Sequence, residues 1–520
     1  MRTLTIQVLV LACLSSAPAA ASTWHVRRDA GPGGDGTSWA AAFQTVQDGL
    51  AAAQPGDQVW VAAAVYRPGT GANPPTVSFV LPANVALYGG FAGDETTLAE
   101  RDWEANPTVL SGDLSLNDDP GVPATLADNC HHVVRVPGGT SAAVLDGFVV
   151  TAGNAVAGPG LTTSGGGLWV QGSATLRHLV VEENRAAAYG GGLAVEFGYA
   201  LVERSTPGSR SAGNVATQEG GGIDLFYAGI VLSGTTIAYN HAQSGGGIIY
   251  GGSGGVLPWN SILWGNTATG GNPPVLNQQV ANGLSAAWTG NGNAVEGWTA
   301  PWNADPLWVD PLGPDGIAGT DDDDFRLSCV SPYIDRGSNT GAAGSTHDLA
   351  GGPRFLDDPA TPDQGSGTAP IVDLGPYEFA CGCDDAQPYC DAVANSTGGL
   401  AAISWSGSTS VLANAFTLLV TDGVPLKFAH FFYGTQTAPE VPFGDGVRCV
   451  GGSLFRTGAF QLDANGAGSR QLDFTLPPAG SGPGQVLPGS TWYFQCIVRD
   501  PAGGPMGFNA SNALEATFCP

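Results

Sequence analysis

Short apolar runs separated by turn residues fill the chain up to Phe379. From residue 165 they recur in pairs: one run directly follows a glycine cluster, as in Leu193-Ala194-Val195, and the other precedes an asparagine, as in Ile230 to Ala238. Runs of this length that are rich in β-branched residues are typical of β-strands. The pattern therefore predicts an all-β protein with two visible strands in each repeat.

Glycine clusters set the period of this pattern. Gly-Gly-Gly begins at residues 165, 190, 220 and 245 and Gly-Gly at residue 270, and an asparagine precedes each cluster, at positions 154, 184, 214, 240 and 266. Strands that recur in one direction with this period pair in parallel with the next coil, which predicts a parallel β-helix, and parallel crossovers are nearly always right-handed. We expect both residue types at one corner. Glycine permits positive φ, and asparagine tolerates the left-handed region and can hydrogen-bond to its equivalent one coil away.

The β-helix has a predicted cap at its N-terminal end. Ser38 is a candidate N-cap for a short helix in which Phe43, Val46, Gln47 and Leu50 share a face, and a strand from Gln58 to Ala63 follows. This helix would cover the apolar surface that the first coil leaves without a neighbour. About eleven or twelve coils would make the β-helix about 55 Å long.

After Phe379 the glycine corners stop, and cysteines, aromatic strands and Pro-Gly turns take over. The alternation of apolar and polar residues there is typical of an antiparallel β-sandwich. It is found in Phe416–Val420, Phe428–Tyr433, Gln471–Leu476 and Trp492–Val498. We expect three parts: a signal peptide over residues 1–21, the parallel β-helix over 22–379, and a disulfide-containing β-sandwich over 380–520.

The first 21 residues have the features of a secretory signal peptide: Arg2, an apolar run from Leu4 to Leu14, and small residues before Ser22. Alternatively, Cys13 is the acylated residue of a lipoprotein signal, although Leu11 stands where that motif prefers a small residue. We expect an exported protein that is extracellular or associated with the outer membrane. No later stretch reaches about 18 uninterrupted apolar residues, so we expect no transmembrane helix.

The cysteine content indicates whether disulfides form, and the net charge limits the possible binding partners. Eight of the nine cysteines remain once Cys13 leaves with the signal peptide, and an even number in an exported chain favours disulfides. Six of the eight lie after Phe379, and we also interpret Cys130, which precedes His131 and His132, as a disulfide partner. The net charge is −27. Nucleic acid is excluded as a partner because it needs clustered cations, and an anionic polysaccharide would be repelled unless calcium bridged the two.

Several stretches resemble known β-helix proteins. The clusters Gly190-Gly-Gly-Leu193 and Gly220-Gly-Gly-Ile223, spaced by Asn-x-Ala turns, resemble the repeats of the right-handed parallel β-helix superfamily, especially those of polymorphic outer-membrane proteins. Leu87 to Asp113 and Asp305 to Glu378 contain motifs similar to secreted bacterial proteins of the choice-of-anchor Q type. The resemblance covers roughly residues 35–379 and implies fold and export rather than an activity. Pro488 to Asn512 resembles a C-terminal module of secreted bacterial proteins, which could be an anchor, a secretion signal or a carbohydrate-binding module.

The strands that follow the glycines carry the candidate binding site. If Leu193, Val195 and their equivalents face inward, two neighbouring columns face outward. One column is Trp169, Ala194, Asp224 and Ile249, and the other is Gln171, Glu196, Phe226 and Gly251. Aromatic rings beside acids suit a glycan, so Trp169, Glu196, Asp224 and Phe226 are the predicted ligand-binding residues. Glu196 and Asp224 would lie about 8 Å apart, within the carboxyl separation of inverting glycosidases. Alternatively, these residues only decorate a solvent-exposed face.

Other catalytic signals are weaker. A lyase would need a cationic or strongly basic residue beside calcium-binding acids, and Arg177, His178 and Arg185 lie in the same region. The arrangements that resemble the catalytic signature of polygalacturonases are missing, and Lys427, the sole lysine, lies outside the β-helix. Gly251 to Gly255 matches G-x-S-x-G only formally, because it is a turn of a glycine-rich coil rather than a strand-to-helix elbow.

The best metal candidate is an acidic, glycine-containing loop. Asp310, Asp315, Asp321 and Asp323 could wrap a hard cation with oxygen ligands, which makes a structural Ca²⁺ possible, and a solvated loop is the alternative. No motif requires a cofactor. The sequence favours an exported or cell-surface β-helix protein that binds an extracellular polysaccharide or cell-surface glycan, or mediates adhesion, without catalysis. The alternatives are a polysaccharide lyase or glycoside hydrolase acting through Glu196 and Asp224, and a structural cell-envelope protein.

Overall fold

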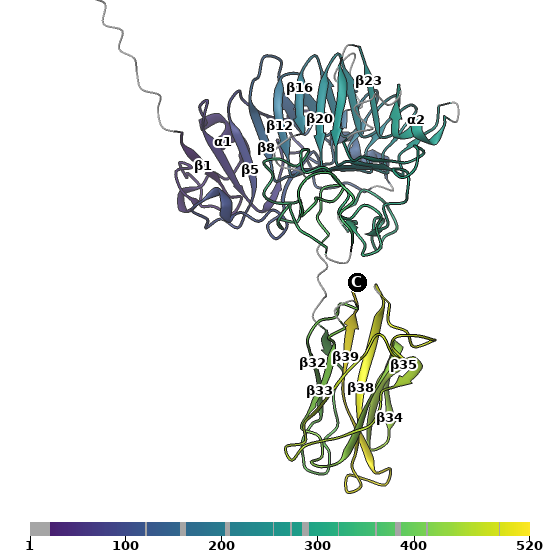
Figure 1. Cartoon of the computed structure of the whole chain (residues 1–520). Helices are drawn as coiled ribbons and strands as arrows, with labels where there is room; N and C mark the ends of the chain where they lie inside the picture. The colour runs from purple at the N-terminus through teal and green to yellow at the C-terminus, as the bar shows by residue number, and fades with distance from the viewer. Residues whose placement is uncertain are drawn as a thin grey trace, which may run out of the picture.

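The computed structural model consists of a parallel β-helix and an antiparallel β-sandwich (Figure 1). This confirms the predicted fold class. The structure describes residues 21–119, 122–155, 163–202, 209–252, 254–270, 273–282, 291–320, 322–358, 361–379, 386–411, 414–487 and 489–519.

Three long parallel sheets form the walls of the β-helix, and a row of two-residue strands forms one corner. Sheet A has the order β1 (Thr23–Val26), β2 (Gln58–Ala62), β5 (Ala86–Phe91), β8 (Ala143–Asp146), β12 (Ser173–Arg177), β16 (Tyr199–Val202), β20 (Gly229–Ser233) and β24 (Gly255–Trp259). Sheet B has the order β3 (Ala64–Tyr66), β6 (Thr108–Ser111), β9 (Val149–Thr151), β13 (Val180–Glu182), β17 (Ser209–Ala212), β21 (Thr235–Ala238), β25 (Ile262–Trp264) and β28 (Ala294–Val295). Sheet C has the order β4 (Phe79–Val80), β7 (Val134–Val136), β11 (Leu168–Val170), β15 (Leu193–Glu196), β19 (Ile223–Phe226), β23 (Ile248–Gly251) and β27 (Val280–Ala281). The corner row is β10 (Asn154–Ala155), β14 (Arg185–Ala186), β18 (Val215–Ala216), β22 (His241–Ala242) and β26 (Thr267–Ala268).

The glycine clusters permit the close stacking of successive coils. The first glycine of each Gly-Gly-Gly cluster has a left-handed backbone, for example φ 61° at Gly190 and 65° at Gly220. A Cβ on the following residue, Gly191, would lie 2.6 Å from the carbonyl oxygen of Gly221 in the next coil. Any side chain there would collide with backbone, which explains why the glycines recur with the period of the coil.

The asparagines form a ladder along the β-helix. The Nδ2 of Asn184 donates to Oδ1 of Asn214 at 3.1 Å, and the same bond continues to Asn240 and Asn266 at 3.0 Å. These side chains are buried, so the ladder satisfies amides that water cannot reach. The left-handed backbone expected at asparagine belongs instead to the preceding residue, such as Glu183 with φ 55°. The N–H of the asparagine itself donates to the next side chain of the ladder.

The β-helix is shorter than predicted because the segment from Asp305 to Phe379 does not continue the coils. The longest sheets have eight strands, which corresponds to a length of about 38 Å. In this segment β29 (Trp308–Asp310) and β30 (Asp324–Leu327) form an antiparallel pair. Trp308 and Phe325 pack on Ala212 and Ala238, outside sheet B. Figure 1 shows the segment in green beside the β-helix.

The N-terminal cap also differs from the prediction. Helix α1 (Val46–Ala52) begins after Thr45, whose side chain accepts a hydrogen bond from the first turn, whereas Ser38 caps only a 3₁₀ turn, Trp39–Ala41. β1 precedes α1 in the chain and pairs directly with β2, so the helix belongs to the connection between the first two strands of sheet A. Val46 and Leu50 pack against the interior of the β-helix, as a cap requires. Further short helices are α2 (Val275–Gln279) and the 3₁₀ turns Leu98–Glu100 and Pro123–Asp128.

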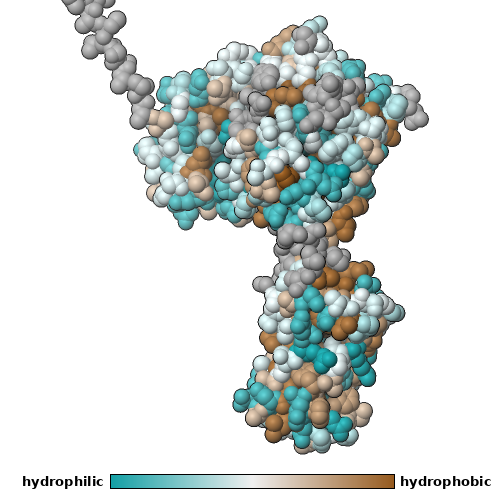
Figure 2. Space-filling model, in the orientation of Figure 1, coloured by the Kyte–Doolittle hydropathy of each residue, from teal (hydrophilic) through white to brown (hydrophobic). Residues whose placement is uncertain are grey.

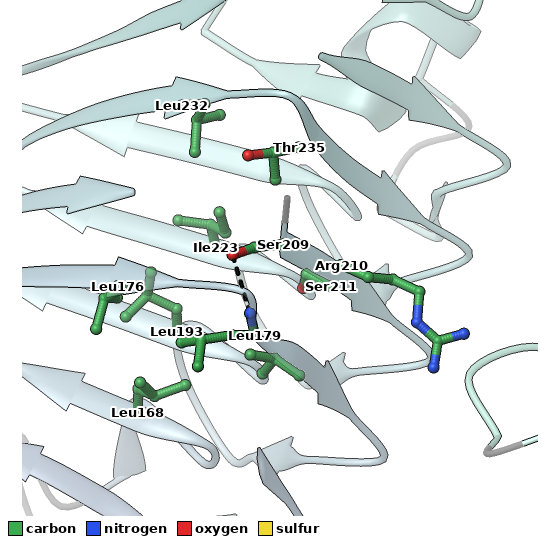
Figure 3. Close-up of a pocket in the computed structure, with 11 residues that line it drawn as sticks. Leu168, Leu176, Leu179, Leu193, Ser209, Arg210, Ser211, Ile223, Leu232 and Thr235 are labelled. Atoms are coloured by element: carbon green, nitrogen blue, oxygen red, sulfur yellow. Dashed lines mark hydrogen bonds between the residues drawn. The ribbon is translucent and has the colours of Figure 1, made fainter. Parts of the chain in front are cut away.

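Aliphatic side chains from all three sheets fill the interior of the β-helix. A cavity of about 30 Å³ remains beside Leu193 and Ile223 (Figure 3). The Ser209 hydroxyl borders it and accepts a hydrogen bond from the Leu179 N–H at 3.3 Å, while the guanidinium of Arg210 points away. A space of this size holds about one water, so it is a packing defect and not a ligand site.

The C-terminal domain is the predicted β-sandwich. Its larger sheet has the order β31-β39-β38-β34-β35, with β36 beside β34, and its smaller sheet has the order β32-β33-β37. The strands are β31 (Gln387–Tyr389), β32 (Ala402–Ser406), β33 (Thr417–Thr421), β34 (Phe428–Phe443), β35 (Gly446–Arg456), β36 (Phe460–Gln461), β37 (Gly468–Gln471), β38 (Thr491–Arg499) and β39 (Phe508–Thr517). Leu418, Phe431 and Phe494 meet in its core. The strand predicted from Gln471 to Leu476 is wrong, because Asp473 accepts the Thr475 N–H and turns the chain.

The disulfides predicted from the sequence are found for some cysteines of the C-terminal domain only. Cys390 and Cys449 form a disulfide, and Cys519 is also disulfide-bonded. Among the described residues Cys130, Cys329 and Cys496 are free. The prediction of a disulfide at Cys130 is therefore wrong; its thiol packs in the apolar interior of the β-helix.

The predicted signal peptide, including Cys13, precedes the first described residue except for Ala21. In the part of the chain that the structure describes, no helix is both long enough and apolar enough to cross a membrane.

Candidate functional site

The predicted strip on sheet C has the expected register. Ala194 of β15 pairs with Trp169 of β11 on one side and with Asp224 of β19 on the other, and Glu196 pairs with Phe226. Glu196 and Asp224 are therefore one coil and one column apart, as the alternation predicted. The strand period of two, combined with parallel pairing, determines this geometry.

The two acids of the strip are buried, contrary to the expectation of an exposed face. Glu196 is 2% exposed and Asp224 6%, so a substrate cannot reach either carboxyl in this arrangement. The indole Nε1 of Trp169, itself buried, donates to Glu196 Oε2 at 2.9 Å. Arg135, the partner of Trp169 in the preceding coil, stacks its guanidinium 4.7 Å from the indole ring. Trp169 thus covers Glu196, and the alternation along a strand carries no information about such cover.

Burial changes the ionisation of both acids. Burial, reinforced by the negative charges of Glu219 and Glu196, raises the pKa of Asp224 to about 7. Burial also raises the pKa of Glu196, against the opposing hydrogen bond from Trp169. A pair of acids with raised pKa values can supply a general acid, but only to a substrate that reaches it.

Three aromatic side chains do reach solvent at the end of the same strands, and we call them the aromatic platform: Phe197, Phe226 and Tyr227. Their exposed fractions are 64%, 44% and 53%. The rings of Phe197 and Tyr227 are nearly parallel at 6.0 Å, and Phe226 meets both edge-on at 5.4 and 4.8 Å. Phe226 was predicted as a ligand-binding residue. The sequence did not point to Phe197 and Tyr227, because each lies one position beyond the end of its strand. The pairing register nevertheless places them at equivalent positions of neighbouring coils.

An open hollow begins at the edge of the platform. Its volume is about 520 Å³, and Tyr227 forms its border with the glycine-rich starts of β20 and β24. Gly229 and Gly255 are partners in neighbouring coils. Glycines leave the polar groups of the backbone accessible, and the volume of the hollow suits a few sugar units.

A second polar site lies at the turn between β12 and β13. His178 Nδ1 is 2.7 Å from Asp146 Oδ1, and Arg101 Nη2 donates to Asp146 Oδ2 at 2.9 Å. The indole of Trp103 stacks on the His178 ring at 4.1 Å. A pocket of about 490 Å³ adjoins these residues, with His347 on its border.

The Asp146 carboxylate orients the imidazole in this pocket. Burial acts to raise the pKa of Asp146, but His178 and then Arg101 outweigh it and lower the pKa to about 2. His178 Nε2 is buried and has no hydrogen-bond partner among the described residues. An imidazole held in this way can accept a proton. The sequence singled out His178 and Arg177 but missed Asp146, although Asp146 and Arg177 are register partners. Arg101 and Trp103 come from a loop that gives no sequence signal.

The acidic loop does not assemble the predicted metal site among its described residues. Asp315 Oδ1 accepts the Ile317 N–H, and Asp323 Oδ2 accepts the N–H groups of Gly319 and Thr320, so these carboxylates stabilise turns of their own loop. Asp321 lies outside the described residues. Asp310, Asp315 and Asp323 do not bring ligand oxygens within 4.8 Å of one another. Calcium at this loop stays a prediction.

Comparison of the sequence with protein-family models and with curated proteins finds no match. Among solved structures, the chain is similar to one described as pectate lyase Pel9A, with 13% sequence identity and a TM-score of 0.33 over 70% of this chain and 97% of that one. A likeness this distant bears on neither substrate nor activity. Evidence for a function therefore comes from the aromatic platform and the His178 pocket.

Proposed function

We propose that the protein binds an extracellular glycan on the aromatic platform without cleaving it. The observation that carries the proposal is the gathering of three exposed rings, Phe197, Phe226 and Tyr227, at the ends of adjacent strands. Exposed apolar groups of this kind mark interaction surfaces, and sugar rings stack on aromatic faces. On the face shown in Figure 2, apolar residues form patches among hydrophilic ones.

The size of the platform sets the expected affinity. Each aromatic side chain has about 150–250 Å² of surface, so a sugar that covers part of three half-exposed rings removes about 200 Å² from water. At about 25 cal/mol per Å² this gives about 5 kcal/mol before the cost of association. We therefore expect weak binding per site, strengthened when a polymer engages several molecules or sites at once.

Charge selects among glycans. The chain carries a net charge of −27, and Glu196, Asp224 and Glu219 lie next to one another below or beside the platform. A polyanionic chain would be repelled from this surface, so we expect a neutral or cationic polysaccharide.

Cleavage is the second candidate function, and the His178 pocket favours it more than the predicted acid pair does. Glu196, Asp224 and His178 are all almost completely buried, but His178, oriented by Asp146, borders a pocket of about 490 Å³. In a lyase reaction His178 Nε2 would take a proton from a sugar carbon, and Arg101 would balance the negative charge that develops. A carbon–carbon double bond would form as the glycosidic oxygen leaves and takes a proton from water. Nε2 of His178 is buried, and Trp103 stacks on the ring, so Trp103 would have to move before a substrate could reach this nitrogen.

The proposed location of the protein is outside the cell or on its surface. An exported or cell-surface protein with a β-helix of the polymorphic outer-membrane or choice-of-anchor Q type would present the platform to polymers outside the cell. The long repetitive face of a solenoid suits such a ligand. Adhesion would follow if the polymer belongs to another cell.

The test is retention on immobilised polysaccharides, which separates the platform from the rest of the chain. A panel of neutral, cationic and anionic polysaccharides is cast into native gels, and the wild type is compared with Phe226→Ala and with Phe197→Ala. Phe428→Ala is the matched control, because Phe428 is 60% exposed but lies on the β-sandwich.

We expect retention by at least one neutral or cationic polysaccharide, reduced about tenfold in both platform variants, since about 1.4 kcal/mol of lost stacking is tenfold in affinity. The control should behave as the wild type. Unchanged retention of the platform variants, or loss in Phe428→Ala alone, would contradict the proposal.

A further inference from the structure

A fully buried carboxylate without a partner lies in the segment that folds back along the β-helix. Asp335 is 0% exposed, and neither of its carboxylate oxygens has a hydrogen-bond partner among the described residues. Ligand oxygens of Asp335, Asp357 and Asp363 all lie within 4.8 Å of one another. A buried charge without a partner is strongly unfavourable, so something has to balance it.

The nearby cations are engaged elsewhere. Arg354, also fully buried, pairs with Glu378 at 2.8 Å and donates to the Asp373 carbonyl. Arg336, the next residue after Asp335, donates to the Pro332 carbonyl and stacks over a tryptophan. Neither guanidinium is therefore available to the three aspartates.

Asp373, another buried acid of this segment, has the partners that Asp335 lacks. Its Oδ1 accepts the Asp335 N–H at 2.6 Å, and its Oδ2 accepts the Phe379 N–H. Backbone donors thus satisfy Asp373, whereas the carboxylate of Asp335 lies beside those of Asp357 and Asp363.

Backbone hydrogen bonds hold the segment after Asp363 against the turn at Asp335. The carbonyl of Asp335 accepts the N–H groups of Gln364 and Gly365 at 2.9 and 3.1 Å, and Ser366 donates to Gly337. These bonds fix the residues next to Asp363 against the turn that contains Asp335. Asp335 itself has a left-handed backbone, φ 51°, which costs about 1–3 kcal/mol at a non-glycine residue and persists only where surrounding contacts enforce it.

We propose that Asp335, Asp357 and Asp363 bind a divalent cation, and that this cation is calcium. The ligands are all oxygens, which excludes soft metals. Asp357 and Asp363 are exposed, so water can complete the six to eight ligands that Ca²⁺ takes in flexible loops. Mg²⁺ demands a near-ideal octahedron, which three carboxylates on irregular turns suit less well. Bound calcium would tie the segment that covers sheet B into one unit. The proposal does not depend on glycan binding.

The test uses the full chain after chelation and desalting. Calcium and, separately, magnesium are titrated by calorimetry, and the melting temperature is measured with each ion and with EDTA. Asp363→Asn and Asp357→Asn remove exposed ligands without disturbing the core. Asp315→Asn is the matched control, because it removes one charge from the acidic loop that the sequence suggested as a calcium site.

We expect saturable calcium binding and a rise in melting temperature at millimolar calcium, with at least tenfold weaker binding of magnesium. Asp363→Asn and Asp357→Asn should each weaken calcium binding at this site at least tenfold, and Asp315→Asn should not. Asp335→Asn should melt at or above the wild type in EDTA and below it in calcium, because the amide needs no counter-ion. No binding at millimolar calcium, or loss of binding in Asp315→Asn but not in Asp363→Asn, would overturn the proposal.

Discussion

Replacing Asp224 by asparagine should stabilise the protein at alkaline pH. Asp224 is 6% exposed, and burial together with Glu219 and Glu196 raises its pKa from the ordinary 3.8 to about 7. A carboxyl whose pKa is raised on folding is accommodated in its neutral form. Its favourable contribution is complete below the unfolded pKa and is lost as the pH rises through about 7.

The magnitude follows from the size of the shift. A displacement of about three pKa units corresponds to about 4 kcal/mol at 1.36 kcal/mol per unit, and water entering the site would reduce this to about 2–4 kcal/mol. Asp224→Asn removes the ionisation and keeps the shape of the side chain. We therefore expect the variant to exceed the wild type by about 2–4 kcal/mol at pH 8 and by nearly nothing at pH 4.

Denaturant unfolding at a series of pH values, followed by tryptophan fluorescence, measures this difference. Asp94→Asn, a substitution of an exposed aspartate in the same β-helix, controls for the change in net charge. The reasoning is refuted if the Asp224→Asn gain is the same at pH 4 and pH 8, or if the control shows the same pH-dependent gain.

Three further predictions concern the scaffold. Asn214→Ala should lower the unfolding free energy by about 2 kcal/mol or more, because the buried N–H and Nδ2 of Asn184 both lose this acceptor and Oδ1 of Asn240 loses one of its donors; thermal melts check this, and an unchanged midpoint would contradict it. Asp146→Asn should cost about 3 kcal/mol near pH 7, because the buried Arg101 loses its counter-charge. Since the folded pKa of Asp146 is lowered to about 2, the advantage of the wild type should be complete above pH 4 and disappear as the pH falls towards 2; a pH-independent difference in melting would argue against the pairing. Replacing both Cys390 and Cys449 by alanine, which removes a disulfide between residues 59 apart, should destabilise the β-sandwich by about 4 kcal/mol and leave the β-helix unaffected, as calorimetry of the variant and the wild type would show.

The repetitive part of the fold was predictable because each coil repeats the same steric demand. Gly191 has to be glycine since backbone of the next coil occupies the place of a side chain, and Asn214 has to be polar in a fixed orientation to continue the ladder. Alternation along paired strands then places Asp224 beside Ala194 without further information. These constraints are local, so sequence alone expresses them.

Features that depend on contacts between distant segments were not predictable. Glu196 was expected to face solvent, but its exposure depends on Trp169 from the previous coil. Asp146 meets Arg101 across 45 residues, and a loop without periodicity supplies that arginine. The fold-back of residues 305–379 shortens the β-helix because its turns bring Trp308 and Phe325 onto sheet B, which no repeat pattern encodes.

The claim that the protein binds a glycan without cleaving it is tested most directly by measuring binding and product formation in one sample. The purified protein is incubated with the polysaccharide that retains it, and the bound fraction is measured together with new reducing ends and with the ultraviolet absorbance of unsaturated sugars. The account predicts saturable binding that Phe226→Ala weakens, with neither product accumulating. Products that accumulate with the wild type and disappear in a His178→Ala variant would contradict it and transfer the function to the pocket beside Asp146.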